Sequence, residues 1–102
     1  MARSATKQRE SVPFDPGLES LMHDVGVSYR ALAERTGLSA GYLNHLAHGN
    51  RPVPSDEVIQ RISKALGVKP DRFLEYRVRR VADVLRRKPD VADKVYKDLV
   101  KR

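Results

Sequence analysis

The chain has 102 residues, no cysteine and a formal net charge of +7, which suits one small domain with a modest core. The absence of cysteine excludes a disulfide framework and a thiolate zinc site. No run of about 18 apolar residues exists to span a membrane, and the polar first residues lack the apolar core of a signal peptide, so we expect a cytoplasmic location.

The N-terminal segment, residues 1–13, is polar and without apolar periodicity, and it predicts a flexible arm. The arm is either a plain chain end or a basic segment that follows a DNA groove through Arg3, Lys7 and Arg9. Residues 13–17 are a turn cluster of Pro and Gly. The first helix then follows from Leu18 to Val25 and closes at Gly26.

Two short helices joined by a tight turn are predicted at about 28–36 and 39–48. Gly37 ends the first of them, because glycine adopts the left-handed conformation without a Cβ penalty, and Ser39 is the N-cap of the second. Apolar spacings of three and four define the inward stripes, which are Leu32, Ala33 and Thr36, and then Leu43, Leu46 and Ala47. Such a pair can hold its second helix in a DNA groove.

Three further helices are predicted after the linker at residues 52–54. The fourth runs from the N-cap Ser55 to Leu66. The fifth opens at Pro70, completes the core with Phe73 and Leu74 and continues to about Arg87. The break at residues 88–90 precedes a sixth amphipathic helix, whose apolar positions are Val91, Val95, Tyr96, Leu99 and Val100.

The positive charge lies mostly in this second half, because residues 1–51 carry six Lys and Arg against five Asp and Glu, and residues 52–102 carry fourteen against eight. A basic protein attracts polyanions, but a ribosome-associated or simply cationic soluble protein would be equally basic. Cations crowd the polar positions of the fifth helix, namely Arg72, Arg77, Arg79, Arg80, Arg86, Arg87 and Lys88.

The apolar positions of the fifth and sixth helices form short heptad-like seams. Either the sixth helix folds back onto the fifth within a monomer, or the two seams build a homodimer contact. The candidate dimer residues are Leu74, Val78, Val81, Leu85, Val91, Val95 and Leu99.

The string LAERTGLSAGYLNHLAHGNRPVP, followed by VIQRISKALGV, resembles the XRE/Cro-like helix-turn-helix family of bacterial and phage DNA-binding regulators. The matching pattern is an Ala four residues before the turn Gly, a Leu just after it and two inward Leu in the next helix. The resemblance covers roughly 55 residues and implies an all-α fold, a compact five-helix domain whose third helix is the recognition helix. We therefore divide the chain into the arm at 1–13, the helix-turn-helix domain at 14–76 and a C-terminal helical extension at 77–102.

The resemblance also implies which residues contact double-stranded DNA. Base readers in the family match Ala40, Gly41, Asn44 and His45. Asn44 can pair with adenine, and His45 with a guanine or a donor edge, whereas Ala40 and Gly41 are smaller than the polar residues that many members carry there. The expected phosphate or backbone contacts are Ser28, Tyr29, Arg30, Ser39, Tyr42, His48, Asn50 and Arg51.

Some of these side chains have interpretations that involve no DNA contact. Tyr42 either stacks on a sugar or supports the loop, or else it simply covers Leu38 or the fourth helix. His45 and His48 share a helix face, but no third ligand lies at a recognisable spacing, so no metal or other cofactor is predicted. Neither a nucleophile beside a base nor a small-molecule site is recognisable, and we expect no enzyme activity.

Two functions of different class follow. The first is a sequence-preferring transcriptional regulator that binds DNA as a homodimer. The second is an antitoxin-like or adaptor protein whose C-terminal helices bind another protein, with DNA binding secondary.

Overall fold

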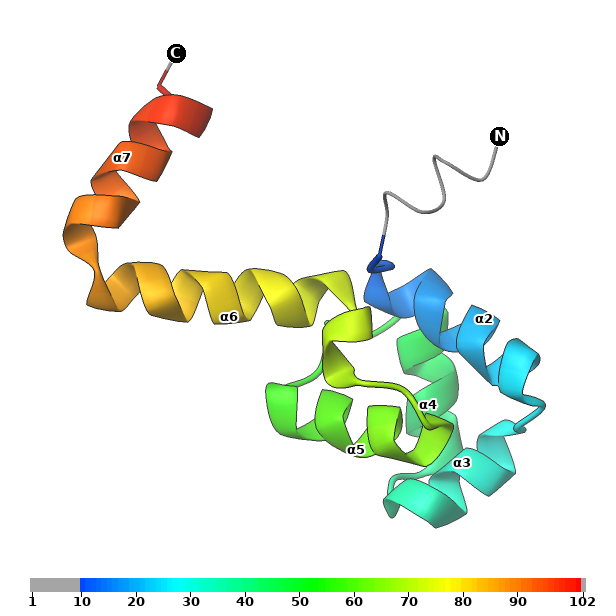
Figure 1. The fold of residues 1–102 in the computed structure, drawn as a ribbon. Coiled ribbons are helices and arrows are strands. Elements are labelled where there is room, and N and C mark those ends of the chain that lie inside the picture. Colours follow the sequence, from blue (N-terminus) through cyan, green and yellow to red (C-terminus); the bar gives the residue numbers. More distant parts are fainter. Residues whose placement is uncertain (1–9, 102) are drawn as a thin grey trace.

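The computed structural model describes residues 10–101, and within this range the chain is all-helical (Figure 1). The predicted arm lies for the most part outside the described residues. The elements in chain order are α2 (Phe14–Val25), α3 (Tyr29–Thr36), α4 (Ala40–Ala47), α5 (Asp56–Leu66), the 3-10 turn η1 (Pro70–Arg72), α6 (Leu74–Arg87) and α7 (Pro89–Leu99).

Helix α2 begins at Phe14, four residues earlier than predicted, so the expected turn cluster is its first turn. Pro16 is tolerated there because the first N–H groups of a helix have no intrahelical partner. Gly17 already donates its N–H to the carbonyl of Pro13 at 2.9 Å. A Cβ at Gly17 would collide with the Val12 side chain, so a glycine is needed for close packing at this point.

The end of the predicted flexible arm is held in place by main-chain pairing. Val12 donates its N–H to the carbonyl of Arg72 at 2.9 Å and accepts from the N–H of Leu74 at 2.8 Å. This pairing holds Phe73 in an extended conformation. The predicted continuous fifth helix is therefore wrong, because the chain is interrupted at Phe73 between η1 and α6.

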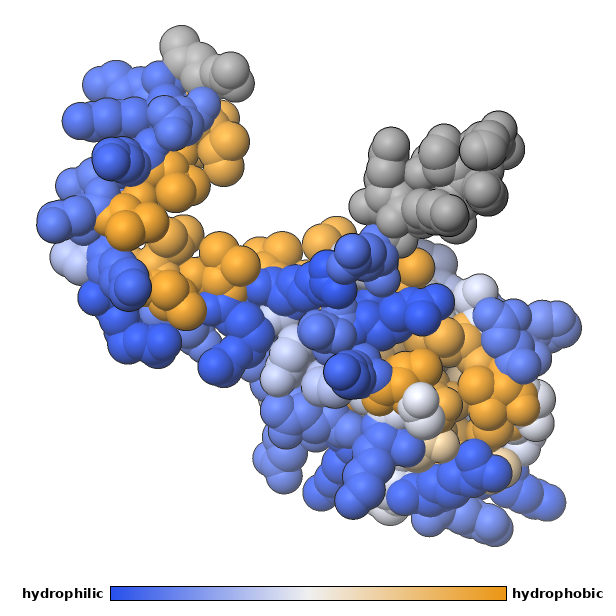
Figure 2. All heavy atoms as spheres, viewed as in Figure 1, coloured by the Kyte–Doolittle hydropathy of each residue, from blue (hydrophilic) through white to orange (hydrophobic). Residues whose placement is uncertain are grey.

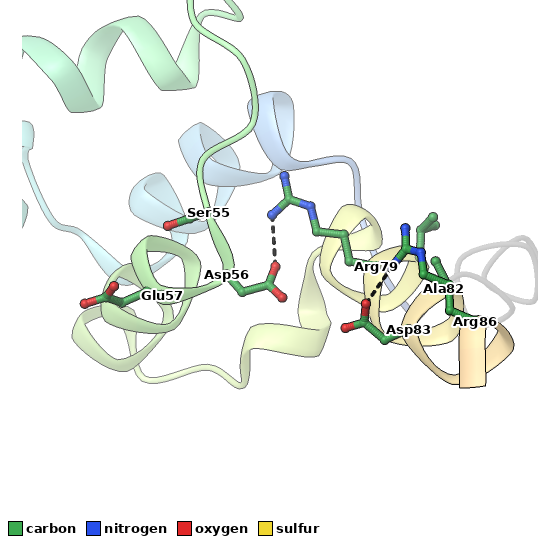
Figure 3. A pocket seen from close by; sticks show the side chains of 8 residues that line it. Ser55, Asp56, Glu57, Arg79, Ala82, Asp83 and Arg86 are labelled. Carbon is green, nitrogen blue, oxygen red and sulfur yellow. Dashed lines mark hydrogen bonds and ion pairs between the residues drawn. The ribbon is translucent and has the colours of Figure 1, made fainter.

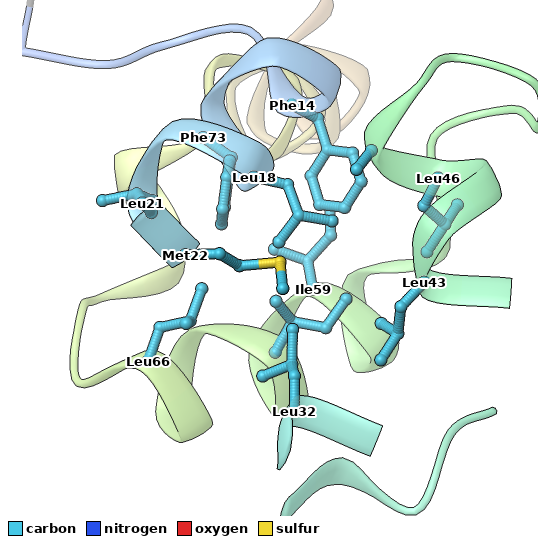
Figure 4. Packing of buried hydrophobic residues seen from close by; sticks show 12 residues of the cluster. Phe14, Leu18, Leu21, Met22, Leu32, Leu43, Leu46, Ile59, Leu66 and Phe73 are labelled. Carbon is cyan, nitrogen blue, oxygen red and sulfur yellow. The ribbon is translucent and has the colours of Figure 1, made fainter. Parts of the chain in front are cut away.

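The hydrophobic core lies among α2, α3, α4 and α5, with Phe73 closing it (Figure 4). The rings of Phe14 and Phe73 are tilted against each other with centroids 4.9 Å apart. The fully or nearly buried apolar residues are Phe14, Leu18, Leu21, Met22, Leu32, Leu43, Leu46, Ala47, Ile59, Ile62, Leu66 and Phe73. All the inward leucines predicted for α3 and α4 belong to this core.

Helices α6 and α7 project from the domain, with a sharp bend between them (Figure 1). From here on, "the arm" means these two C-terminal helices and not the N-terminal segment. The radius of gyration is 16.0 Å, against about 13 Å for a compact chain of 100 residues. Val78 and Val81 are each 57% exposed. The alternative in which the sixth helix folds back and buries the seam of the fifth is therefore wrong.

An apolar strip follows the inner side of the bend between α6 and α7 (Figure 2). Its exposed residues are Leu74, Val78, Val81, Val84, Val91, Tyr96, Leu99 and Val100. The prediction that Leu74 completes the core is wrong, because Leu74 is 41% exposed and Phe73 alone turns inward at this point. Leu85 and Val95, also predicted for this seam, are half-buried. Among the residues that the structure describes, no helix is both long and apolar enough to cross a membrane.

Candidate nucleic-acid interface

The turn between α3 and α4 is fixed by hydrogen bonds from both sides. Gly37 has a left-handed φ of +79° and donates its N–H to the carbonyl of Ala33, a conformation that a residue with a Cβ adopts only at a cost. The buried Thr36 hydroxyl donates to the carbonyl of Leu32 at 2.8 Å and accepts from the N–H of Leu38 at 3.2 Å. This network sets the direction of α4.

Ser39 caps α4 as predicted, because its hydroxyl accepts from the N–H of Tyr42 at 3.0 Å. Two arginines stabilise the neighbouring helix ends. Arg61 donates to the carbonyl of Thr36 at 3.2 Å and Arg35 to that of Ala65 at 3.3 Å. The recognition helix predicted at 39–48 is thus the regular helix Ala40–Ala47 with Ser39 and His48 as its caps.

The outward face of α4 carries the predicted base readers. Gly41, Asn44 and His45 are exposed, and Ala40 is half-buried. A Cβ at Gly41 would meet nothing within 4 Å, so packing does not require a glycine there. Glycine inside a helix costs about 0.5–1 kcal/mol relative to alanine. Gly41 therefore lowers stability, and the described residues offer no packing reason for it.

His48 lies one turn after Asn44 and is tied to it. Its Nδ1 lies 2.9 Å from the carbonyl oxygen of Asn44, which fixes the ring at the end of α4. Among the described residues, no three His, Asp or Glu side chains are grouped so as to hold a metal ion.

The loop after α4 places its cation over an aromatic ring. The Arg51 guanidinium lies 5.7 Å from the ring centroid of Tyr42, within the range of a cation–π contact. Tyr42 is half-buried against the core. Its ring therefore supports the loop, which is one of the roles left open by the sequence, and holds the exposed Arg51 in a defined place beside Asn50.

The start of α3 carries three predicted phosphate contacts. Ser28 accepts from the N–H of Ala31 at 3.1 Å, and Arg30 is exposed. Tyr29 differs, because its hydroxyl is buried and has no hydrogen-bond partner among the described residues. Burial and, to a smaller extent, the charge of Glu19 raise the pKa of Tyr29 above the ordinary tyrosine value. Its backbone N–H, rather than its hydroxyl, is the group at the helix start.

Two residues that join α6 to the rest of the chain were not singled out from the sequence. The carboxylate of Glu75 accepts the N–H of Phe14 at 2.9 Å, and Arg79 donates to the loop that joins α4 to α5. In the sequence, Arg79 was only one of seven cations along the predicted fifth helix. Neither Glu75 nor Arg79 stands at a spacing that indicates its contact. Backbone acceptors are invisible in an amino-acid pattern.

Comparisons with known proteins agree with this geometry. Residues 17–76 match the family described as helix-turn-helix domain. The crystal structure of the clp gene regulator ClgR from Corynebacterium glutamicum is similar, with 28% identity and a TM-score of 0.55 over 86% of this chain and 90% of that one. A match over 86% of a 102-residue chain cannot be confined to the residues up to the end of α5, so it includes part of the arm that α6 and α7 form.

The search of curated proteins gave no match. The family match spans more than half of the chain and includes α3, the turn at Gly37 and α4. This protein therefore belongs to the helix-turn-helix domain family.

Proposed function

We propose that this protein is a sequence-preferring transcriptional regulator that inserts α4 into the major groove of double-stranded DNA. The observation that carries the proposal is the outward face of α4, where Asn44 and His45 are exposed on a helix whose other side is buried in the core. Both side chains can hydrogen-bond base edges. The likeness to ClgR, described as a gene regulator, supports the same class.

Gly41 supports a close approach of α4 to the bases. The open space in front of its Cα leaves room for a base edge or a thymine methyl where a longer side chain would hold the helix away. Gly41 destabilises α4 and is not required by packing. Its presence is explained if a DNA base occupies the space that a side chain would fill. Ala40, at the start of the helix, is similarly small.

Phosphate contacts position the module in this proposal. Arg51, held over Tyr42, meets one backbone phosphate. Ser28, Arg30 and the first N–H groups of α3 meet another, because a helix start attracts anions. Ser39, His48 and Asn50 are the remaining candidates around α4. Since Arg30 and Arg51 are the two cations in this set, the salt-dependent part of binding is modest.

The protein acts as a homodimer in this proposal, and the apolar strip is the contact. A contiguous strip of exposed apolar side chains over two helices is typical of a protein interaction site. A second copy is the occupant we infer, because the bend between α6 and α7 gives each copy an apolar concave side that the arm of the other can enter. Two modules joined so would read successive major grooves about 34 Å apart.

The deciding experiment is selection of binding sites from random double-stranded DNA by the full chain. We expect one enriched motif with two related halves, and the Asn44→Ala and His45→Ala variants should lose preference at defined base positions. Failure to enrich a motif, together with capture of a stoichiometric protein partner through residues 73–100, would instead support the antitoxin-like or adaptor function.

A further inference from the structure

Within the part of the chain that the structure describes, the hydrogen bonds that join α6 to the domain lie in its first turns. Leu74 is paired with Val12, Glu75 bonds Phe14, and Arg77 donates to the carbonyl of Asp71. Among the described residues, Arg79 is the last on α6 with a hydrogen bond to the domain. Every later residue of the arm takes its direction from these contacts.

Arg79 makes the most extensive of these contacts. Its Nη1 donates to the carbonyl of Pro54 at 2.7 Å and to the carboxylate of Asp56 at 2.9 Å, and its Nη2 lies 3.3 Å from the carbonyl of Val53. Figure 3 shows the guanidinium reaching from α6 to Asp56 at the start of α5. Both residues line a cleft of about 690 Å³. One planar fork thus bonds three oxygens, a geometry that an ammonium group cannot reproduce.

The acceptors of Arg79 belong to the segment that follows the candidate DNA-contacting loop. Pro54 is buried and Val53 packs against the core, so both carbonyls sit on rigid backbone. Arg51 lies two residues before Val53, over the Tyr42 ring. A single side chain therefore connects the arm to the backbone that places a phosphate contact.

We propose that Arg79 is a positioning residue that fixes the angle at which α6 leaves the helix-turn-helix domain. Where the protein acts as the dimer proposed above, and only on that basis, this angle also sets the spacing between the two half-sites. Two α4 helices at the ends of rigid arms fit one spacing, because each added base pair turns the second site by about 35°. Loosening the Arg79 contact lets the arms accommodate neighbouring spacings.

Arg79→Met is the informative variant, because it keeps the apolar stem and removes the fork. Arg80→Met is its matched control. Arg80 is the next residue on the same helix, and its nearest acid is Asp83, also on α6, at 3.6 Å. Arg79→Lys keeps the charge without the fork, and Asp56→Asn removes the ion pair while leaving both carbonyls, so these two variants still test the contact should Arg79→Met fail to fold.

The first measurement needs no DNA. Because the chain has no cysteine, Lys64→Cys on α5 and Arg87→Cys at the end of α6 give two exposed spin-label sites without background. Distances between the labels are measured by pulsed electron paramagnetic resonance on full chains diluted with unlabelled protein. We expect one narrow distribution for the parent and Arg80→Met, and a broad or shifted one for Arg79→Met, with Arg79→Lys in between. Identical distributions in all four would overturn the proposal.

The second measurement uses the motif enriched by the full chain, with its two halves set apart by varied spacers. A one-base-pair change should weaken binding of the parent and Arg80→Met by about tenfold, and of Arg79→Met by less than about threefold. Affinity for a single half-site should be equal in all three. If Arg79→Met loses as much affinity as the parent when the spacer changes, Arg79 does not set the spacing between the half-sites. If the parent enriches no motif at all, the proposed function itself is contradicted.

Discussion

The carboxylate of Glu75 accepts a hydrogen bond from the backbone N–H of Phe14 at 2.9 Å, across 61 positions of sequence. Pro13 precedes α2 and provides no side-chain cap, so a residue from the first turn of α6 caps this helix instead. The negative charge also lies at the positive end of the α2 dipole. One contact therefore stabilises both the start of α2 and the first turn of α6.

Glu75→Ala should therefore lower the free energy of unfolding by about 1 kcal/mol, as for the loss of a helix N-cap. Glu75→Gln, which retains an acceptor oxygen, should lose less. Urea unfolding followed by circular dichroism measures both. The exposed Glu34, in the middle of α3, is the control, and its change to Ala should stay within about 0.5 kcal/mol. Equal effects at both positions would contradict the capping role.

Gly41→Ala should separate stability from DNA binding. The added Cβ meets open space, so the helix should gain about 0.5–1 kcal/mol. The same methyl group would hold α4 away from the bases, and we expect specific binding to weaken by about tenfold, or ~1.4 kcal/mol. Thermal unfolding and fluorescence anisotropy on the selected site give the two values. A more stable variant with unchanged affinity would exclude a close approach at this position.

Arg51→Ala should weaken binding to every DNA sequence, and by the same factor for each, because a phosphate contact does not depend on the base sequence. Loss of one phosphate contact reduces the steepness of log K against log salt concentration by about 0.9. The measurement is a salt titration on the selected and on an unrelated duplex. Lys97→Ala, far along the arm in α7, serves as control and should keep the parent slope. A parent-like slope for the Arg51 variant would exclude this contact.

Val81→Asp should convert a dimer into a monomer. Val81 is 57% exposed in the single chain, so the substitution leaves the core of the domain intact but introduces a charge into the proposed apolar contact. Sedimentation should give twice the 11.5 kDa chain mass for the parent and once for the variant. Lys94→Asp, a polar exposed site on α7, should remain dimeric. A parent that sediments as a monomer would contradict the dimer itself.

Tyr29 should make stability fall with rising pH in alkaline solution. Burial raises the pKa of its hydroxyl, so the folded state retains the proton when the unfolded state, with a pKa of about 10, has already released it. The free energy of unfolding is unaffected by this group below pH ~10 and declines as pH rises through the folded pKa.

Tyr29→Phe isolates that contribution, because the other tyrosines titrate in both proteins. The variant also removes a buried hydroxyl that has no partner among the described residues, so it should be at least as stable as the parent at pH 7. Its advantage should grow above pH ~10 in denaturant unfolding. A constant difference across that range would show that the Tyr29 pKa is not raised.

Local patterns predicted the helix-turn-helix pair and failed where distant residues decide. The leucine spacing lies within α3 and α4, and Gly37 and Ser39 are the residues between them, so a short stretch of sequence was enough to predict the pair. The start of α2 is capped by Glu75, and the interruption at Phe73 depends on Val12 pairing with residues 72–74. No local window of sequence contains either pair of partners. The direction of the arm depends likewise on carbonyl acceptors of Arg79, and a sequence does not record where a carbonyl points.

The pairing of Val12 with Phe73 also bears on the order in which the molecule folds. It joins the two ends of the segment that contains the whole core, and closing so long a loop costs more chain entropy than closing the short turns among α3, α4 and α5. Those local contacts form sooner. During synthesis and refolding, the arm accordingly acquires its fixed direction only once the domain beneath it exists.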